Sequence, residues 1–212
     1  MCGAFLLLSL PPEIGRLEVR QANLLVIFLV VQLVVVTYLC SASASMEVLF
    51  EGEKGLPDLV LSGFSHRTIA VGKATSSAAY AAWLVAMALP LVALASAVRG
   101  AGIGTVLGAS AVIAAVGTAA GTWGAWLAGR FASDFTRSFV HWVLLAALLG
   151  GTALLGPRWE AVSPLRVLDG VVRSGWTPSA AVSAVGYLVV GAVGAWLIER
   201  HVRGARAEEG DS

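Results

Sequence analysis

Charged residues are scarce in this chain of 212 residues, of which 13% are charged and 58% are apolar. Soluble domains typically carry about 25% charged and roughly 45–50% apolar residues. The mean hydropathy is +0.83, and the repeated long uncharged runs are typical of membrane spans. The formal net charge of +1 gives no reason to expect a nucleic-acid partner. The composition therefore predicts an integral membrane protein whose surface contacts the lipid bilayer.

Motifs for catalysis and metal binding are also missing. The two cysteines, Cys2 and Cys40, lie far apart in the chain, which argues against a disulfide or metal framework. The stretch "VGKAT" at 71–75 departs from the phosphate-binding motif G-x-x-x-x-G-K-[ST], because Arg67 and Ala74 occupy two of its required positions. We therefore predict that the chain is not an enzyme and binds no cofactor or metal of its own.

The apolar runs are long enough to cross a hydrocarbon layer of about 30 Å at about 1.5 Å per residue. In lipid such runs form helices, because a lone strand would leave its backbone groups unpaired. The predicted fold is an all-α polytopic integral membrane protein with about five transmembrane helices. These are expected at 24–44, about 76–98, 103–128, about 138–156 and about 180–198.

Two short connections add detail to this fold. The sequence "VRGAGIG" at 98–104 leaves room only for a tight turn, so the second and third spans are expected to form an antiparallel hairpin. The third span carries glycines four residues apart, at Gly104 and Gly108 and again at Gly117 and Gly121. Small residues at this spacing allow close helix packing, either within one subunit or between two.

The insert at 46–74 interrupts the apolar pattern with charges and turn residues. Its first part extends the first span into water and is expected to end at Gly55, and Ser65 is a candidate N-cap for the next span. Between them, Leu56 to Leu61 are predicted to form a short apolar helix, with Pro57 suited to its first turn. This helix would lie either in the lipid interface or in a groove on a partner protein.

Few polar residues lie inside the predicted spans. Gln32, in the middle of the first span, is the candidate for a translocation path or an interhelical hydrogen bond, while Thr118 and Thr122 are expected to bond to their own helix. The absence of ionisable residues in the spans favours an apolar or amphipathic cargo over an ion. In the loop at 157–179, "LRVLDGVVRSGW" is amphipathic and predicts an interfacial or re-entrant helix.

The insert resembles the permease subunits of ABC-2 type exporters. The small-residue run Ser41–Ser45 leads to Glu53-Lys54-Gly55, a leucine-rich segment ending at Ser62, and Gly72-Lys73 before the next span. The sequences "ASDFTRSFVHWVLL" and "SPLRVL" resemble later parts of the family pattern. The resemblance covers about residues 24–200. It implies a cytoplasmic coupling helix that contacts a separate ATPase at Glu51, Glu53, Lys54, Gly55, Leu56, Asp58, Leu59, Leu61, Ser62 and Ser65.

The same resemblance implies the partners and the domain organisation. ATP and Mg²⁺ would bind to the ATPase subunit, and a second permease copy or a homologous permease would complete the exporter. The family usually has six spans, so residues 1–23 are expected to be the remnant of a first span or an interfacial segment. Residues 24–200 would form the transmembrane domain and 201–212 a polar tail.

Orientation follows from the basic residues near the ends of the spans. If the C-terminus is cytoplasmic, eight arginines and lysines lie on that side and six on the other, which is a slight preference. The expected location is the cell inner (plasma) membrane, multi-pass, with a cytoplasmic C-terminus. Two other functions are compatible with the sequence, a membrane scaffold or anchor without transport activity, and an ATP-independent carrier.

Overall fold

A computed structural model describes residues 17–54, 65–131, 134–152 and 157–210. Within these ranges the regular structure is helical throughout, as the sequence predicts. Its elements are α2 (Leu17–Lys54), α4 (His66–Arg99), α5 (Ile103–Arg130), α6 (Asp134–Ala146), the π-helical η1 (Ala147–Gly151), the 3₁₀ helix η2 (Pro157–Val162), α8 (Pro164–Ser174) and α9 (Pro178–Gly210).

Four of these helices contain stretches long and apolar enough to cross a membrane: Leu24–Met46, His66–Arg99, Ile103–Ala128 and Pro178–Arg203. They correspond to four of the expected spans, and the protein is membrane-embedded. The remaining expected span, at 138–156, is a shorter apolar helix, Ser138–Leu149, which continues into η1. The end of that expected span, at 153–156, lies outside the described residues.

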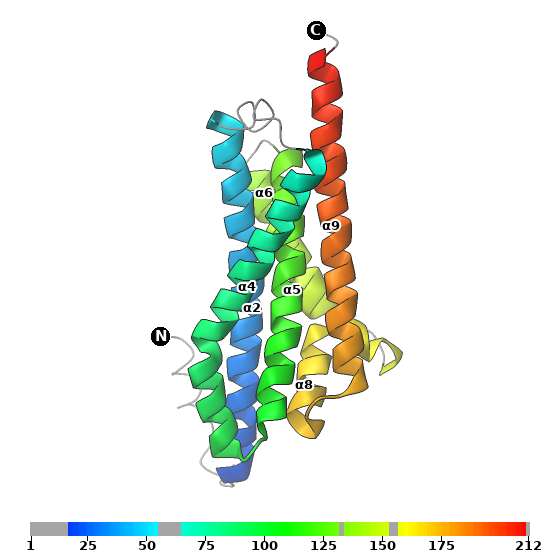
Figure 1. The fold of residues 1–212 in the computed structure, drawn as a ribbon. Helices are drawn as coiled ribbons and strands as arrows, with labels where there is room; N and C mark the ends of the chain where they lie inside the picture. Colours follow the sequence, from blue (N-terminus) through cyan, green and yellow to red (C-terminus); the bar gives the residue numbers. More distant parts are fainter. Residues whose placement is uncertain (1–16, 55–64, 132–133, 153–156, 211–212) are drawn as a thin grey trace.

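The spanning helices form an elongated bundle (Figure 1). Helices α2, α5 and α9 run in one direction, while α4 and α6 run in the other. As a result, the end of α2, the start of α4 and the C-terminal part of α9 lie at the same end of the bundle, which we call the insert end. The α4–α5 turn and α8 lie at the opposite end, which we call the hairpin end.

Helix α4 begins and ends at residues with strong capping signals. The Ser65 side chain accepts a hydrogen bond of 3.1 Å from the Thr68 amide, which confirms the expected N-cap. At the other end Gly100 adopts a φ of 74°, and its amide donates to the Ala97 carbonyl while the Ala101 amide donates to Ser96. This Schellman geometry requires a left-handed residue, which glycine adopts without strain. The predicted tight α4–α5 hairpin is therefore present.

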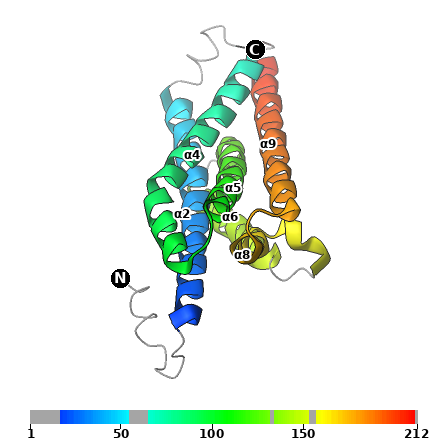
Figure 2. The same ribbon diagram turned by 60° about the horizontal axis from the view of Figure 1, so that its bottom comes forward.

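Helix α5 lies in the middle of the bundle, with α2 and α4 on one side and α9 on the other (Figure 2). Its small residues set the helix spacing. A Cβ placed on Gly117 would come within 3.2 Å of the Ala81 Cβ of α4, and one on Gly124 within 2.9 Å of the Ser41 Cα of α2. Of the predicted close-packing glycines, Gly104 faces open space. The others pack within this chain.

Helix α8 closes the hairpin end of the bundle. Ser163 caps its N-terminus and Pro164 follows at the first position, a favourable order because that amide would have no helical partner. Its apolar face is buried against α5, α2 and α9 through Val167, Leu168 and Val171. Asp169 pairs with Arg173 on its outer face at 2.8 Å. The amphipathic helix predicted from the sequence is thus packed against the bundle.

Large apolar side chains cover the outside of the bundle. On α4, Trp83, Met87 and Leu91 are each more than half exposed, and α9 presents Val182, Val185 and Leu188 in the same way. In water such a continuous apolar exterior would be unfavourable. In a bilayer it is the surface that contacts the lipid chains.

Candidate functional site

An apolar cavity of about 240 Å³ lies among α2, α5, α6 and α9. The α2 wall consists of Thr37, Tyr38 and Ser41, and α9 contributes Tyr187 and Val190. The remaining lining residues come from the central helix and the α6–η1 segment: Val116, Ala119, Ala120, Trp123, Leu127, His141, Leu144, Leu145 and Leu148. Most of the wall is therefore hydrocarbon or aromatic ring, which is typical of sites for apolar ligands.

The side chains of three lining residues donate hydrogen bonds to backbone carbonyls. Tyr187 donates its hydroxyl to the Val162 carbonyl at 2.6 Å, and the Trp123 indole N–H donates to the Val190 carbonyl at 3.1 Å. Thr37 donates to the Leu33 carbonyl of its own helix at 2.6 Å. Because these donors are occupied, the wall formed by these residues has little capacity to recognise a polar ligand.

The end of the cavity nearest the insert is more polar. The Ser45 Oγ lies 3.0 Å from the Gly124 carbonyl, 2.8 Å from the Ser41 carbonyl and 3.2 Å from His141 Nε2. Ser45 has one hydroxyl proton for these three contacts, and the direction of its contact with His141 follows from the tautomer of that ring. Tyr38 and Trp142 stack beside this contact with their ring centroids 5.1 Å apart. These residues tie α2, α5 and α6 together at this level.

The insert is joined to the bundle at two places, the C-terminal part of α2 and the start of α4, which we call its roots. Both roots pack against neighbouring helices. The α2 root is fixed by the Ser45–Gly124 hydrogen bond to α5. The α4 root packs in a small separate core in which Ala70 of α4 meets Ala125 of α5 and Ile198 and Val202 of α9. Any displacement of the insert would therefore be passed into α2, α4 and α5.

The residues predicted to contact an ATPase are only partly described. Glu51, Glu53 and Lys54 form the last turn of α2, which ends at Lys54, as the sequence predicts. Ser65 is the exposed N-cap of α4. Gly55, Leu56, Asp58, Leu59, Leu61 and Ser62 lie outside the described residues, so the predicted short helix stays a prediction.

Gln32, predicted to serve a path or an interhelical bond, is buried at 7% exposure. It does not line the cavity, and neither atom of its amide has a hydrogen-bond partner among the described residues. The structure therefore assigns it no interhelical bond. Thr118 and Thr122 behave as expected, because they donate to the Ala114 and Ala119 carbonyls of their own helix.

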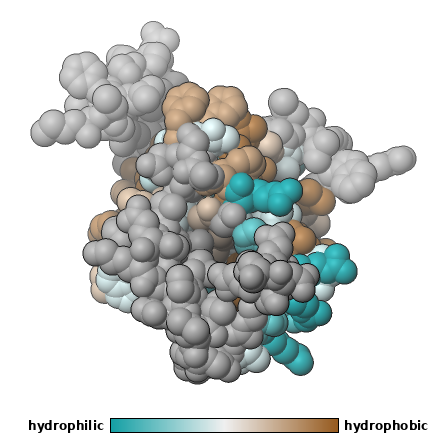
Figure 3. Space-filling view, turned by 90° about the horizontal axis from the view of Figure 1, so that it is seen from above, coloured by the Kyte–Doolittle hydropathy of each residue, from teal (hydrophilic) through white to brown (hydrophobic). Residues whose placement is uncertain are grey.

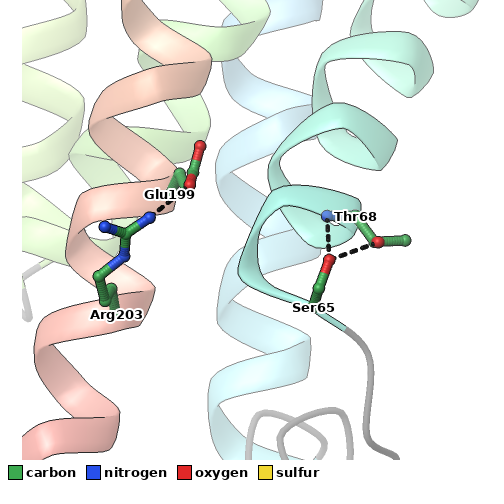
Figure 4. A network of polar contacts seen from close by, with 4 residues as sticks. All are labelled: Ser65, Thr68, Glu199 and Arg203. Carbon is green, nitrogen blue, oxygen red and sulfur yellow. Dashed lines mark hydrogen bonds and ion pairs between the residues drawn. The ribbon is translucent and has the colours of Figure 1, made fainter.

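The described surface at the insert end is rich in cationic groups. Seen from this end, hydrophilic side chains gather on one side of the molecule (Figure 3). Basic residues here include Arg67 and Lys73 of α4, Arg130 of α5 and Arg200 and Arg203 of α9. Glu199 pairs with Arg203 at 2.7 Å, on α9 beside the first turn of α4 (Figure 4). Basic residues also lie at the hairpin end, among them Arg99, Arg166 and Arg173, so the two ends differ only slightly in charge.

Comparisons with known proteins identify no relatives. No family model matches the chain, and neither a curated protein nor a solved structure matches it. Within the described ranges, no three side chains of His, Cys, Asp or Glu lie close enough together to hold a metal ion.

Sequence reasoning missed the cavity because its wall comes from separate helices. Thr37, Trp123 and Tyr187 share no spacing along the chain, and each alone resembles an ordinary packing or interfacial residue. The one usable signal was the position of His141 inside an apolar stretch. A histidine there must find a polar partner, and that partner proved to be Ser45.

Proposed function

We propose that this chain is the membrane-spanning permease subunit of an ABC-2 type exporter. It would couple ATP hydrolysis by a separate ATPase subunit to export of an apolar or amphipathic substrate, together with a second permease copy or a homologous permease. The insert end would face the cytoplasm and the chain would lie in the cell inner membrane. Glu51, Glu53, Lys54, Leu56, Asp58, Leu59 and the turn residues around them would form the contact with the ATPase.

The observation that carries this proposal is the anchoring of both roots of the insert. A coupling element must transmit force, and transmission requires a rigid connection to the spans. Ser45 joins the α2 root to α5, and Ala70 joins the α4 root to α5 and α9. A push on the insert by a closing pair of ATPase subunits would move these helices as a packed unit.

The distribution of charge supports the same function. The slight excess of basic residues at the insert end, among them Arg67 and Arg200, favours a cytoplasmic position, which is where ATP is available. The described parts of the spans enclose an apolar cavity whose lining contains no Asp, Glu, Lys or Arg. An apolar cargo fits this interior better than an ion does.

Co-purification would test the proposal. The chain is co-expressed with candidate Walker-motif ATPase subunits and extracted in mild detergent. Wild type should retain the ATPase in stoichiometric amounts, whereas Leu56→Asp combined with Leu59→Asp should lose it, because a buried apolar contact does not tolerate two carboxylates.

A matched control places the same charges elsewhere at this end of the chain. Ala205→Asp combined with Ala207→Asp, in the C-terminal part of α9, should retain the ATPase. Equal thermal unfolding of both double variants would show that the membrane domain is intact. If wild type retains no ATPase, the exporter proposal is wrong and a scaffold or anchor function takes its place.

A further inference from the structure

Along the axis of the bundle, the cavity lies in the half nearest the insert end. On α5 it extends from Val116 to Leu127, which is about 16 Å at about 1.5 Å per residue. The apolar span of α5 runs from Ile103 to Ala128, so Val116 lies at its middle and Leu127 at its insert-end boundary. The length of the cavity therefore matches one leaflet of a hydrocarbon layer about 30 Å thick.

The shape and chemistry of the cavity fit a single hydrocarbon chain. A volume of about 240 Å³ exceeds the roughly 150 Å³ of an apolar protein cavity that admits benzene. Spread over this length, however, it is narrow. Leu144, Leu145 and Leu148 supply aliphatic wall on one side, and Val116 and Ala120 on another. A chain that comes from the bilayer leaves an equally apolar environment, so its affinity for this wall would rest on close van der Waals contact.

The polar groups around the cavity are arranged to suit an amphiphile, which has a polar head and an apolar chain. The His141–Ser45 pair lies at the insert-end boundary, since the apolar span of α2 ends at Met46. Towards the middle of the membrane, the Tyr187 hydroxyl is occupied by the Val162 carbonyl. A ligand with its head near His141 would run past Thr37, Trp123 and Tyr187, whose donors are already bonded to backbone carbonyls.

Access to the cavity is available from the bilayer. Helix α6 packs mainly against α2 and makes at most marginal contact with α9, although both contribute to the wall. The α6 segment also changes to π-helical geometry at Ala147–Gly151, directly where Leu148 lines the cavity. π-Helical turns are frequent at functional sites. A chain in the surrounding lipid could enter between α6 and α9.

We propose that this cavity is a binding site for the alkyl chain of a single-chain amphiphile, such as a fatty acid, drawn from the leaflet at the insert end. The chain lies between α5 and α6, and the polar head lies near His141. The narrow cavity has room for one alkyl chain, so a two-chain lipid would leave its second chain outside. The inference stands without an ATPase partner. If the chain is part of an exporter, the single-chain amphiphile would be the class of cargo that it exports.

Photolabelling would test the site. The full chain is reconstituted in phosphatidylcholine vesicles with palmitic acid that carries a diazirine at the middle of its chain, then irradiated, digested and mapped by mass spectrometry. We expect adducts on the lining residues of α5 and α6, and excess unlabelled palmitate should abolish them. Adducts spread over the outer face of α4, without saturation, would overturn the site and indicate bulk lipid only.

Two variants make the test specific. Ala120→Phe fills the cavity and should lower the saturable labelling by about tenfold, because the phenyl ring takes the place of the chain's van der Waals contacts with the wall. Ala111→Phe, at an exposed position of the same helix, should leave labelling unchanged. Equal labelling of both would overturn the proposal. If Ala120→Phe does not fold, competition by unlabelled palmitate on wild type decides the question.

A third experiment distinguishes the two sources of such a chain, a free fatty acid and a two-chain phospholipid. Phosphatidylcholine with the same diazirine on one of its chains should label the cavity far less than palmitic acid does. Equal labelling would overturn the preference for a single-chain amphiphile. These measurements concern the cavity alone, whereas the co-purification described above concerns the insert alone, so failure of one is distinguishable from failure of the other.

Discussion

The two sides of α5 differ although the helix is rich in small residues throughout. Towards α2 and α4, Gly117, Gly121 and Gly124 leave no room for a Cβ. Towards α6, Ala120 borders an open cavity. A small residue therefore produces close packing only where a neighbouring backbone is held against it. Where the neighbouring helix packs less closely, as α6 does against α5, the same small residue leaves space.

The helices around α5 show the same contrast in burial. In its apolar 18-residue stretch α5 has 61% of the residues buried within the bundle, compared with 28% in the corresponding stretches of α4 and α9. Lipid tails are as apolar as the helices, so burial of apolar surface does not by itself bring helices together in a membrane. Close van der Waals contact does. The side of α5 with closest backbone approach is therefore expected to supply most of the stability.

Substitution on the packed side of α5 should have the largest effect. Gly124→Val would place side-chain atoms against the Ser41 backbone and is expected to lower the free energy of unfolding by about 3 kcal/mol, the upper range for overpacking. Thermal unfolding in detergent measures this. Gly104→Val, at an open position of the same helix, is the control. Equal effects of the two substitutions would show that the close approach does not stabilise the bundle.

Substitution of Gln32 tests whether the packed part of the bundle is stabilised by close packing rather than by side-chain hydrogen bonds. Both polar atoms of its amide are buried without a partner among the described residues. Gln32→Leu should therefore keep or raise the stability by about 1–2 kcal/mol, because a buried unsatisfied amide carries a desolvation cost of that order. The unfolding midpoint in denaturant measures the change.

A comparison residue on the same helix makes the Gln32 result interpretable. Thr37 is buried but donates to the Leu33 carbonyl, so Thr37→Val should gain nothing of this kind. A clear loss of stability in Gln32→Leu would contradict the expectation and would mean that the amide has a partner, for example in a second subunit.

Filling the open side of α5 should have the smallest effect. Ala120→Leu extends into the cavity and is expected to change the free energy of unfolding by less than about 1 kcal/mol, because no existing contact is displaced and new apolar contacts form. The same unfolding assay measures it. A loss as large as that of Gly124→Val would show that the space is closed in solution and would remove the contrast between the two sides.

Much of the fold was predictable because its signals are local. The run from Leu24 to Ala44 has no charge, the Gly100 turn has a strong sequence signature, and Ser65 precedes a helix start. Each of these is determined by residues within a few positions of one another. The amphipathic pattern at 165–173 predicted α8 for the same reason, though not that it would pack against three helices.

The candidate site was less predictable. Gln32 was the polar residue that the sequence singled out, yet it lies outside the cavity, because a mid-span position does not show which neighbours a side chain meets. No local pattern singles out Trp123 or Tyr187, and they line the cavity because α5 and α9 run side by side. The predicted coupling residues remain a prediction, since most of them lie outside the described part of the chain.

By itself, the sequence determined that this protein is helical, that it is embedded in a membrane, and where α4 begins and ends. Hydrophobic runs, caps and turn glycines act over one or two helical turns, so a reader of the sequence can evaluate them directly. The tertiary structure alone decided which glycines meet a backbone, how the roots of the insert are anchored, and where space remains between helices. These depend on contacts between residues far apart in the chain, such as Ser45 with Gly124, and no local pattern encodes them.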